Sequence, residues 1–207
     1  MPKRTFFNLP EDKRKILIQA VEKEFSRVPM FEASIANMVQ DAGIPRGSFY
    51  QYFENKEDAF FYLLKEHTKK RQRDFISLLK QHDGDLFEAM AGTFHNIISD
   101  SPDNLPFIRN ALLNMTHKVE HTFAGIFSSS VMDNSLDEIS PLINKKYLNI
   151  SEDKELFYVM QILTSVTIRN FIEKFSRNLT DEQAICNYTI ELRLLKHGLY
   201  KKEKENA

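Results

Sequence analysis

The sequence contains a single cysteine, Cys186, so no disulfide can form within the chain and the composition suits a reducing compartment. Glycine and proline are also scarce, with six and seven in 207 residues, which favours long helices over a sheet protein with many turns. No run reaches the roughly 18 apolar residues of a membrane-spanning helix, and the first residues lack the apolar core of a signal peptide. These absences predict an all-α protein of the cytoplasm with no membrane partner.

Hydrophobic residues make up 42% of the chain, which is enough to build a sizeable core. Charge is distributed unevenly along the sequence. The first 80 residues hold 15 Lys and Arg against 11 Asp and Glu, and the remaining residues hold 13 against 18. A basic end joined to an acidic end favours a nucleic-acid-binding region followed by a region with another role.

The first three expected helices lie close together. Residues 8–27 open with Asn8 and Glu11 at capping-box spacing and carry an apolar stripe, and Pro29 ends that helix. Ser34 is placed to cap a second helix, and Gly43 supplies the positive φ of a tight turn. A third helix is expected over residues 45–52. This helix, turn and helix are the arrangement of a DNA-binding unit.

The expected third helix has two different faces. Phe49 and Phe53 are four residues apart and are expected to point into the bundle. Arg46, Ser48 and Gln51 then lie on the outer face, where Arg can pair with guanine and Gln with adenine. We expect these three residues to read bases.

The remainder of the chain is predicted to be helical. Asn55 and Asp58 can cap a helix that continues to about residue 81, and further apolar-periodic segments occupy residues 86–99, 104–130, 137–148, 152–177 and 181–202. We place a helix-turn-helix DNA-binding domain at residues 1–56 and an effector-binding and dimerisation domain at residues 57–207, with the helix over residues 56–81 as a shared connector.

The last two expected helices carry apolar residues at spacings typical of a helix-helix seam, and the helix over residues 152–177 is apolar on more than one face. One face can pack within the subunit and the other against a second copy in a four-helix interface. A monomer with a thick core is the alternative. The residues expected at the homodimer contact are Leu156, Leu163, Ile185, Tyr188, Leu192, Leu195 and Leu199.

The segments KILIQAVEKEF and SIANMVQDAGIPRGSFYQYFENKEDAF resemble the tetracycline-repressor (TetR) family of one-component bacterial regulators. The resemblance rests on Ala42-Gly43 in the turn, on Gly47-Ser48-Phe49-Tyr50, on Tyr52-Phe53 and on Lys56. It implies that Ser34, Tyr50, Tyr52 and Lys56 contact DNA phosphates, as Ser48 also could. Two departures from the family pattern are Pro45, where Ser or Thr is common, and Asn37-Met38-Val39, where Asp-Ile-Ala is common.

The aromatic, Met and polar residues of the C-terminal region could line a pocket for a small effector, although plain core packing is the alternative for each of them. Asn96, Asn110 and Asn170 are further polar candidates on these helices. The selected lining residues are Phe94, Asn114, Met115, Phe127, Met160, Thr164 and Arg169.

Other chemistry has little support in the sequence. His117 and His121 have a spacing that can hold a metal ion, but no Cys pair or Glu completes a site, so a surface or pocket pair is favoured. Ser128-Ser129-Ser130 lacks the glycines of a nucleophile elbow. We expect no catalytic residues, no metal, no cofactor and no enzymatic activity.

These patterns and the resemblance together predict a ligand-responsive transcriptional regulator. It would bind a palindromic double-stranded DNA operator as a homodimer, most commonly as a repressor, and a small apolar or amphipathic effector would release it. A DNA-bound scaffold of the same fold, whose C-terminal domain engages a protein partner, is the alternative.

Overall fold

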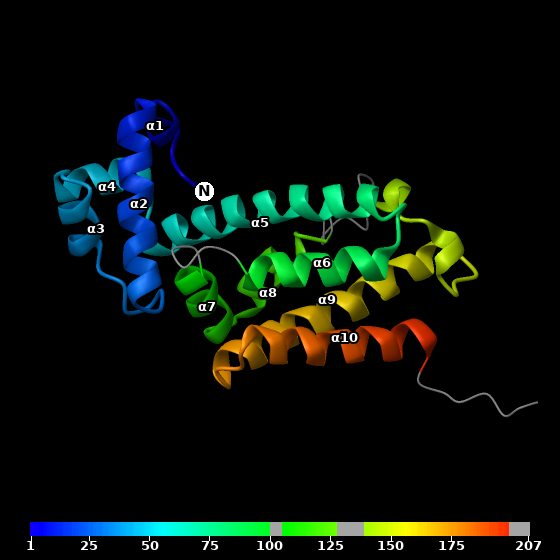
Figure 1. The fold of residues 1–207 in the computed structure, drawn as a ribbon. Helices are drawn as coiled ribbons and strands as arrows, with labels where there is room; N and C mark the ends of the chain where they lie inside the picture. The colour runs from blue at the N-terminus through cyan, green and yellow to red at the C-terminus, as the bar shows by residue number, and fades with distance from the viewer. Residues whose placement is uncertain (100–104, 128–138, 199–207) are drawn as a thin grey trace, which may run out of the picture. The chain divides into compact units, whose positions relative to one another are not determined.

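A computed structural model describes residues 1–99, 105–127 and 139–198. These residues form ten α-helices and two short 3-10 helices, with no strand among them, so the all-α prediction is confirmed (Figure 1). The α-helices are α1 (Arg4–Phe7), α2 (Glu11–Arg27), α3 (Ile35–Asp41), α4 (Arg46–Tyr52), α5 (Lys56–Gln81), α6 (Leu86–Ile98), α7 (Leu105–Leu113), α8 (His117–Ala124), α9 (Asp153–Ser176) and α10 (Asp181–His197).

The chain divides into two compact units. The first contains residues 1–72 and 100–126, and the second contains residues 73–99 and 127–207. Helix α5 is continuous and contributes residues to both. Within the described ranges, no helix is long and apolar enough to cross a membrane.

The ends of several helices agree with the local sequence signals. At the start of α5, the Asp58 amide donates to Asn55 Oδ1 at 2.8 Å, as the capping pattern predicts. At the start of α10, the Gln183 amide donates to Thr180 Oγ1 at 3.2 Å, and the Gln183 side chain accepts from the Thr180 amide at 3.0 Å. Helix α9 likewise covers the predicted segment.

Three predicted segments were wrong in detail. Residues 104–130 are not one helix, because α7 ends at Leu113 and Thr116 caps a separate α8. In the described part of residues 137–148 there are only two 3-10 turns, at Ser140–Leu142 and Lys145–Tyr147. The first long helix begins at Glu11 after Pro10, and the predicted capping box at Asn8 does not form.

The core of the first unit is rich in phenylalanine. Phe25 of α2 contacts Phe60 of α5 edge to face at 5.2 Å between ring centroids, and Phe60 contacts Phe107 of α7 at 5.5 Å. All three rings are buried. Aromatic pairs in this geometry stabilise packing beyond the area that they bury, so α2, α5 and α7 share one core.

The core of the second unit is centred on Phe94 of α6. Its ring stacks on Phe171 of α9 at 4.6 Å and lies 4.3 Å from Tyr188 of α10. The buried Tyr188 hydroxyl is 2.6 Å from Thr167 Oγ1, so its polar end has a partner. Helices α6, α9 and α10 therefore pack around one aromatic cluster.

Candidate nucleic-acid interface

Helices α3 and α4 are joined by a short turn whose geometry depends on glycine. Gly43 has φ of +64°, a conformation that other residues rarely adopt. Its amide donates to the Gln40 carbonyl at 3.1 Å, and the next amide, of Ile44, donates to the Val39 carbonyl at 3.0 Å. These bonds close the C-terminal end of α3 and allow α4 to start at Arg46.

Helix α4 is anchored through its apolar side. Phe49 and Phe53 are completely buried and their rings lie 5.3 Å apart, as the sequence predicts. Arg46 and Gln51 are exposed, Ser48 is half-buried, and the Tyr50 side chain is 41% exposed. The predicted base-reading residues are thus available to solvent on a helix whose other face is fixed in the core.

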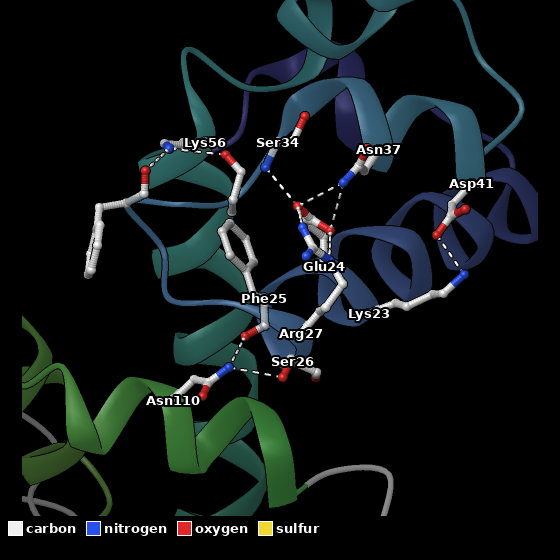
Figure 2. A network of polar contacts seen from close by, with 12 residues as sticks. Lys23, Glu24, Phe25, Ser26, Arg27, Ser34, Asn37, Asp41, Lys56 and Asn110 are labelled. Carbon is white, nitrogen blue, oxygen red and sulfur yellow. Dashed lines mark hydrogen bonds and ion pairs between the residues drawn. The ribbon is translucent and has the colours of Figure 1, made fainter.

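The N-terminal end of α3 is held by a buried carboxylate on α2, shown in Figure 2. Glu24 is only 4% exposed and accepts hydrogen bonds from Arg27 Nε at 2.9 Å, from Arg27 Nη2 at 2.8 Å and from the Ser34 amide at 2.8 Å. Asn37 Nδ2 also donates to both carboxylate oxygens, at 3.2 and 3.3 Å. These donors lower the pKa of Glu24 to about 2, and Arg27 makes the largest contribution. Burial by itself would raise the pKa of this carboxyl group.

Ser34 occupies the N-cap position of α3, as predicted, but its hydroxyl makes no capping bond. The Ser34 amide donates to Glu24, so the side chain on α2 partly replaces the local cap. The Ser34 hydroxyl, on a half-buried residue, is therefore not used by the helix end and stays a candidate for a phosphate contact.

Lys56 makes two contacts within the protein in addition to its predicted role. Its ammonium donates to the carbonyls of Phe31 at 2.5 Å and Ala33 at 3.0 Å, across the loop between α2 and α3 (Figure 2). The ammonium therefore helps to hold this loop. It has three protons, and the one that these carbonyls do not use remains for an acceptor such as a phosphate, so the phosphate contact of Lys56 stays a prediction.

The N-terminal segment, residues 1–7, supports the C-terminal end of α4. The last carbonyls of a helix have no partner within the helix. Here the Lys3 amide donates to the Tyr52 carbonyl at 2.8 Å, Lys3 Nζ donates to the Tyr50 carbonyl at 2.8 Å, and the Thr5 hydroxyl bonds the Gln51 carbonyl. Three consecutive carbonyls of α4 are satisfied in this way. The sequence patterns gave no sign of this contact, because its partners are more than 40 residues apart.

The C-terminal end of α2 receives a similar cap from α7. Asn110 Nδ2 donates to the carbonyls of Phe25 at 3.0 Å and Ser26 at 2.9 Å (Figure 2). Its polarity alone makes Asn110 a candidate for an effector pocket. Its partners show that it joins α7 to the helix that carries Glu24.

The residues predicted to line an effector pocket are divided between the two units. Asn114 and Met115, both half-buried, follow α7 in the first unit, and Asn114 Nδ2 donates to the Asn110 carbonyl at 2.9 Å. The other selected residues belong to the second unit, where four of them are buried. These four are Phe94, Phe127, Met160 and Thr164.

Arg169 does not meet the expectation of a residue facing an apolar cavity. Its side chain is 49% exposed, and its guanidinium donates to Glu173 Oε1 at 2.7 Å and to Glu191 Oε1. Asn170 Nδ2 donates to the other oxygen of Glu191 at 2.7 Å. The guanidinium joins α9 to α10 and is already matched by two carboxylates, so we remove Arg169 from the effector set.

The predicted dimer seam is largely internal. Leu156, Leu163, Tyr188 and Leu192 are buried within the single chain, so they are core residues and cannot form a partner-facing stripe. Ile185 and Leu195 are half-buried, and Leu199 lies outside the described residues. The large apolar side chains that α9 and α10 expose are instead Tyr158, Ile162, Ile190 and Leu194.

His117 and His121 lie one turn apart on α8, with ring centroids 6.4 Å from each other. In the described part of the chain, no group of three or more His, Cys, Asp or Glu side chains is placed to hold a metal ion. We therefore assign no metal ion to this histidine pair.

The family profile described as "Tetracyclin repressor-like, C-terminal domain" matches residues 85–199, which is more than half of the chain. The chain belongs to the TetR family. This match covers the C-terminal region, whereas the motif resemblance lies within residues 15–60, so two separate parts of the chain support the same assignment.

Solved structures show the TetR fold over most of the chain. The fatty acid degradation regulator FadR from Bacillus halodurans is 16% identical, with a TM-score of 0.63, and covers 90% of this chain and 99% of its own. NalD from Pseudomonas aeruginosa, the secondary repressor of the MexAB-OprM multidrug efflux pump, is 13% identical, with a TM-score of 0.59 and coverages of 88% and 95%.

A TetR-family regulator from Streptomyces coelicolor A3 is 14% identical, with a TM-score of 0.54 and coverages of 92% and 98%. No curated protein is significantly similar in sequence. At these identities the structural likeness establishes the TetR fold alone, so the ligand and target genes of those proteins are not transferred to this chain.

Proposed function

We propose that this TetR-family regulator binds a palindromic double-stranded DNA operator as a homodimer and represses transcription until a small effector releases it. The observation that carries the proposal is the fixed presentation of α4. Its inner face is buried through Phe49 and Phe53, its C-terminal carbonyls are held by residues 1–7, and Arg46 and Gln51 remain exposed.

The dimensions of α4 suit the major groove. An α-helix with its side chains is about 10–12 Å in diameter, and the major groove is about 12 Å wide. Arg46, in the first turn, can pair bidentately with guanine, and Gln51 can pair with adenine. In a twofold dimer, two such helices would enter successive major grooves about 34 Å apart, which requires a palindromic site.

The dimer contact that we propose uses the exposed apolar side chains of α9 and α10. Tyr158 and Ile162 are 59% and 52% exposed and lie one turn apart on α9, and Ile190 and Leu194 lie one turn apart on α10. The two helices pack against each other within the second unit. Side chains of this size at i and i+4 present an apolar stripe, which a second copy could cover.

The effector part of the proposal depends on α5 and on the predicted C-terminal pocket. Helix α5 carries residues of both compact units, so an effector that changes the second unit could act on the first through this helix. A coupling free energy of about 1–3 kcal/mol would change operator affinity by about 5- to 150-fold. An apolar or amphipathic effector suits the buried Phe94, Met160 and Thr164.

Selection of binding sites from a random duplex library tests the proposal. The wild-type chain should select a palindrome, and Arg46→Ala should lose discrimination at one base pair of each half-site, by about 5- to 150-fold. Arg177→Ala, an exposed arginine at the end of α9, is the matched control and should leave the selected sequence unchanged. An unchanged preference in Arg46→Ala would remove Arg46 as a reader, and failure to select any sequence would contradict operator binding itself.

A further inference from the structure

The first compact unit contains a pocket that the proposed function does not use. Its volume is about 650 Å³, within the range of about 300–1,000 Å³ that is typical of small-molecule sites. Its walls come from the N-terminal segment, α2, the first half of α5, and α8. Figure 1 shows the N-terminus beside the first turns of α5, where the terminal amine pairs with Asp58.

The lining of the pocket carries more positive than negative charge. Lys69 is paired with Glu66 at 2.8 Å, and Lys118 is paired at 3.0 Å with Glu57 of α5. Two further cations of the lining, Arg14 and Lys65, form no ion pair with any residue that the structure describes, and Arg14 Nη1 donates to the Phe7 carbonyl at 3.4 Å. Two cations in one pocket therefore lack a carboxylate partner.

The pocket also has an aromatic wall. Phe61 and Tyr62 are adjacent residues of α5, and the half-exposed Phe7 ring lies edge to face with Tyr62 at 6.4 Å. Burial raises the pKa of the Tyr62 hydroxyl, so this group remains a neutral donor. Apolar surface beside a few charged groups is the arrangement that orients an amphipathic ligand.

We propose that this pocket binds an amphipathic organic acid. The acid group would contact Lys65 and Arg14, because these cations lack a carboxylate partner and charge-assisted bonds to an anion are strong. The hydrocarbon or aromatic part would lie against Phe61 and Tyr62. This site belongs to the first unit and is separate from the effector pocket predicted from the C-terminal residues.

The site has a direct connection to α4. Met1, Pro2 and Phe7 line the pocket, and the residues between them, Lys3 and Thr5, bond the last carbonyls of α4. An acid that contacts this wall would favour the position in which the N-terminal segment holds α4. Binding of the acid should therefore raise operator affinity, a consequence that rests on the proposed DNA-binding function.

Calorimetric titration of the full chain tests the site without DNA. Decanoate and 2-naphthoate are the probes, with decan-1-ol and 2-naphthol as uncharged analogues of the same shape. We expect at least one acid to bind more tightly than its analogue, Lys65→Ala and Arg14→Gln each to weaken that acid about tenfold or more, and Phe61→Ala to weaken it as well. Lys70→Ala, an exposed lysine of α5 outside the lining, is the control and should bind like wild type.

The outcomes separate the site from the proposed function. If neither acid binds at millimolar concentration, or if binding is the same in Lys65→Ala, Arg14→Gln and wild type, the site is refuted, whether or not the chain binds an operator. Circular dichroism of each variant distinguishes lost binding from lost folding. If the acid binds as expected but operator affinity does not rise, the site stands and its coupling to α4 is refuted.

Discussion

Replacing Glu24 with glutamine tests whether a buried charge on α2 fixes the N-terminal end of α3. The wild-type carboxylate accepts two bonds from Arg27 and one from the Ser34 amide, Asn37 Nδ2 donates to both of its oxygens, and Glu24 is 4% exposed. In Glu24→Gln the side-chain oxygen can still accept from Ser34, but the charge is lost and the new NH₂ group faces donors. The variant keeps the volume of the side chain, removes its charge and replaces one of its two acceptor oxygens by a donor.

The magnitude follows from the lowered pKa. A folded-state pKa of about 2 against the ordinary 4.5 corresponds to about 3 kcal/mol in favour of the folded carboxylate. Because the folded pKa is depressed, this stabilisation is present above pH 4.5 and is lost as pH falls through that value towards 2. It should be about 3 kcal/mol at pH 7 and about 1 kcal/mol at pH 3. Glu24→Gln would keep part of this stabilisation, because its side-chain oxygen can still accept the hydrogen bond from the Ser34 amide.

Urea unfolding followed by far-ultraviolet circular dichroism at pH 7, 5 and 3 measures the difference between Glu24→Gln and wild type. We expect a loss of about 2–3 kcal/mol at pH 7 that narrows towards pH 3. Glu11→Gln on the same helix is the control, because Glu11 pairs with Lys15 on the surface and should contribute little. If the unfolding free energy lost in Glu24→Gln does not change with pH, or equals the loss in Glu11→Gln, the role assigned to Glu24 is refuted.

Two further perturbations test other parts of the structure. Asn110→Ala leaves two carbonyls at the end of α2 without a donor and should lower the unfolding free energy by about 1–3 kcal/mol. The control is Asn149→Ala, at an exposed position, which should leave the unfolding free energy unchanged. Equal losses of unfolding free energy in the two variants would contradict the capping role of Asn110. Ile162→Asp should convert the proposed homodimer to monomer in sedimentation velocity because it buries a charge in the contact. The exposed Tyr147→Asp is its control, and a dimeric Ile162→Asp would exclude the proposed surface.

The features that sequence could predict depend on contacts between near neighbours in the chain. The cap of α5 and the capping box of α10 each join residues that are three positions apart. The turn between α3 and α4 requires a positive φ, and glycine at position 43 indicates this conformation. The inward direction of Phe49 and Phe53 follows from helical spacing. For these reasons the helix-turn-helix unit was recognisable before its tertiary contacts were known.

The helix faces of the second unit show where periodicity stops being informative. Spacing identified Leu156 and Leu163 as members of an apolar stripe, but it could not say whether their partner belongs to the same chain or to another copy. Tyr158 and Ile162 form a second stripe on the same helix, and only the packing of α6 and α10 decides which stripe is covered. In the structure Leu156 and Leu163 are buried within the chain, whereas Tyr158 and Ile162 are exposed.

The missed contacts around α4 have a common physical origin. Isolated helices shorter than about 12 residues are marginal in water, so the seven residues of α4 depend on tertiary contacts to stay helical. Helical spacing predicts which face of α4 is buried. The C-terminal end of α4 is held by Lys3 and Thr5, whose sequence context predicts only ordinary surface residues. A recognition motif identifies the groups that can read DNA. Their placement depends on polar contacts from distant segments, and the N-terminal residues therefore belong to the candidate interface although they lie outside the motif.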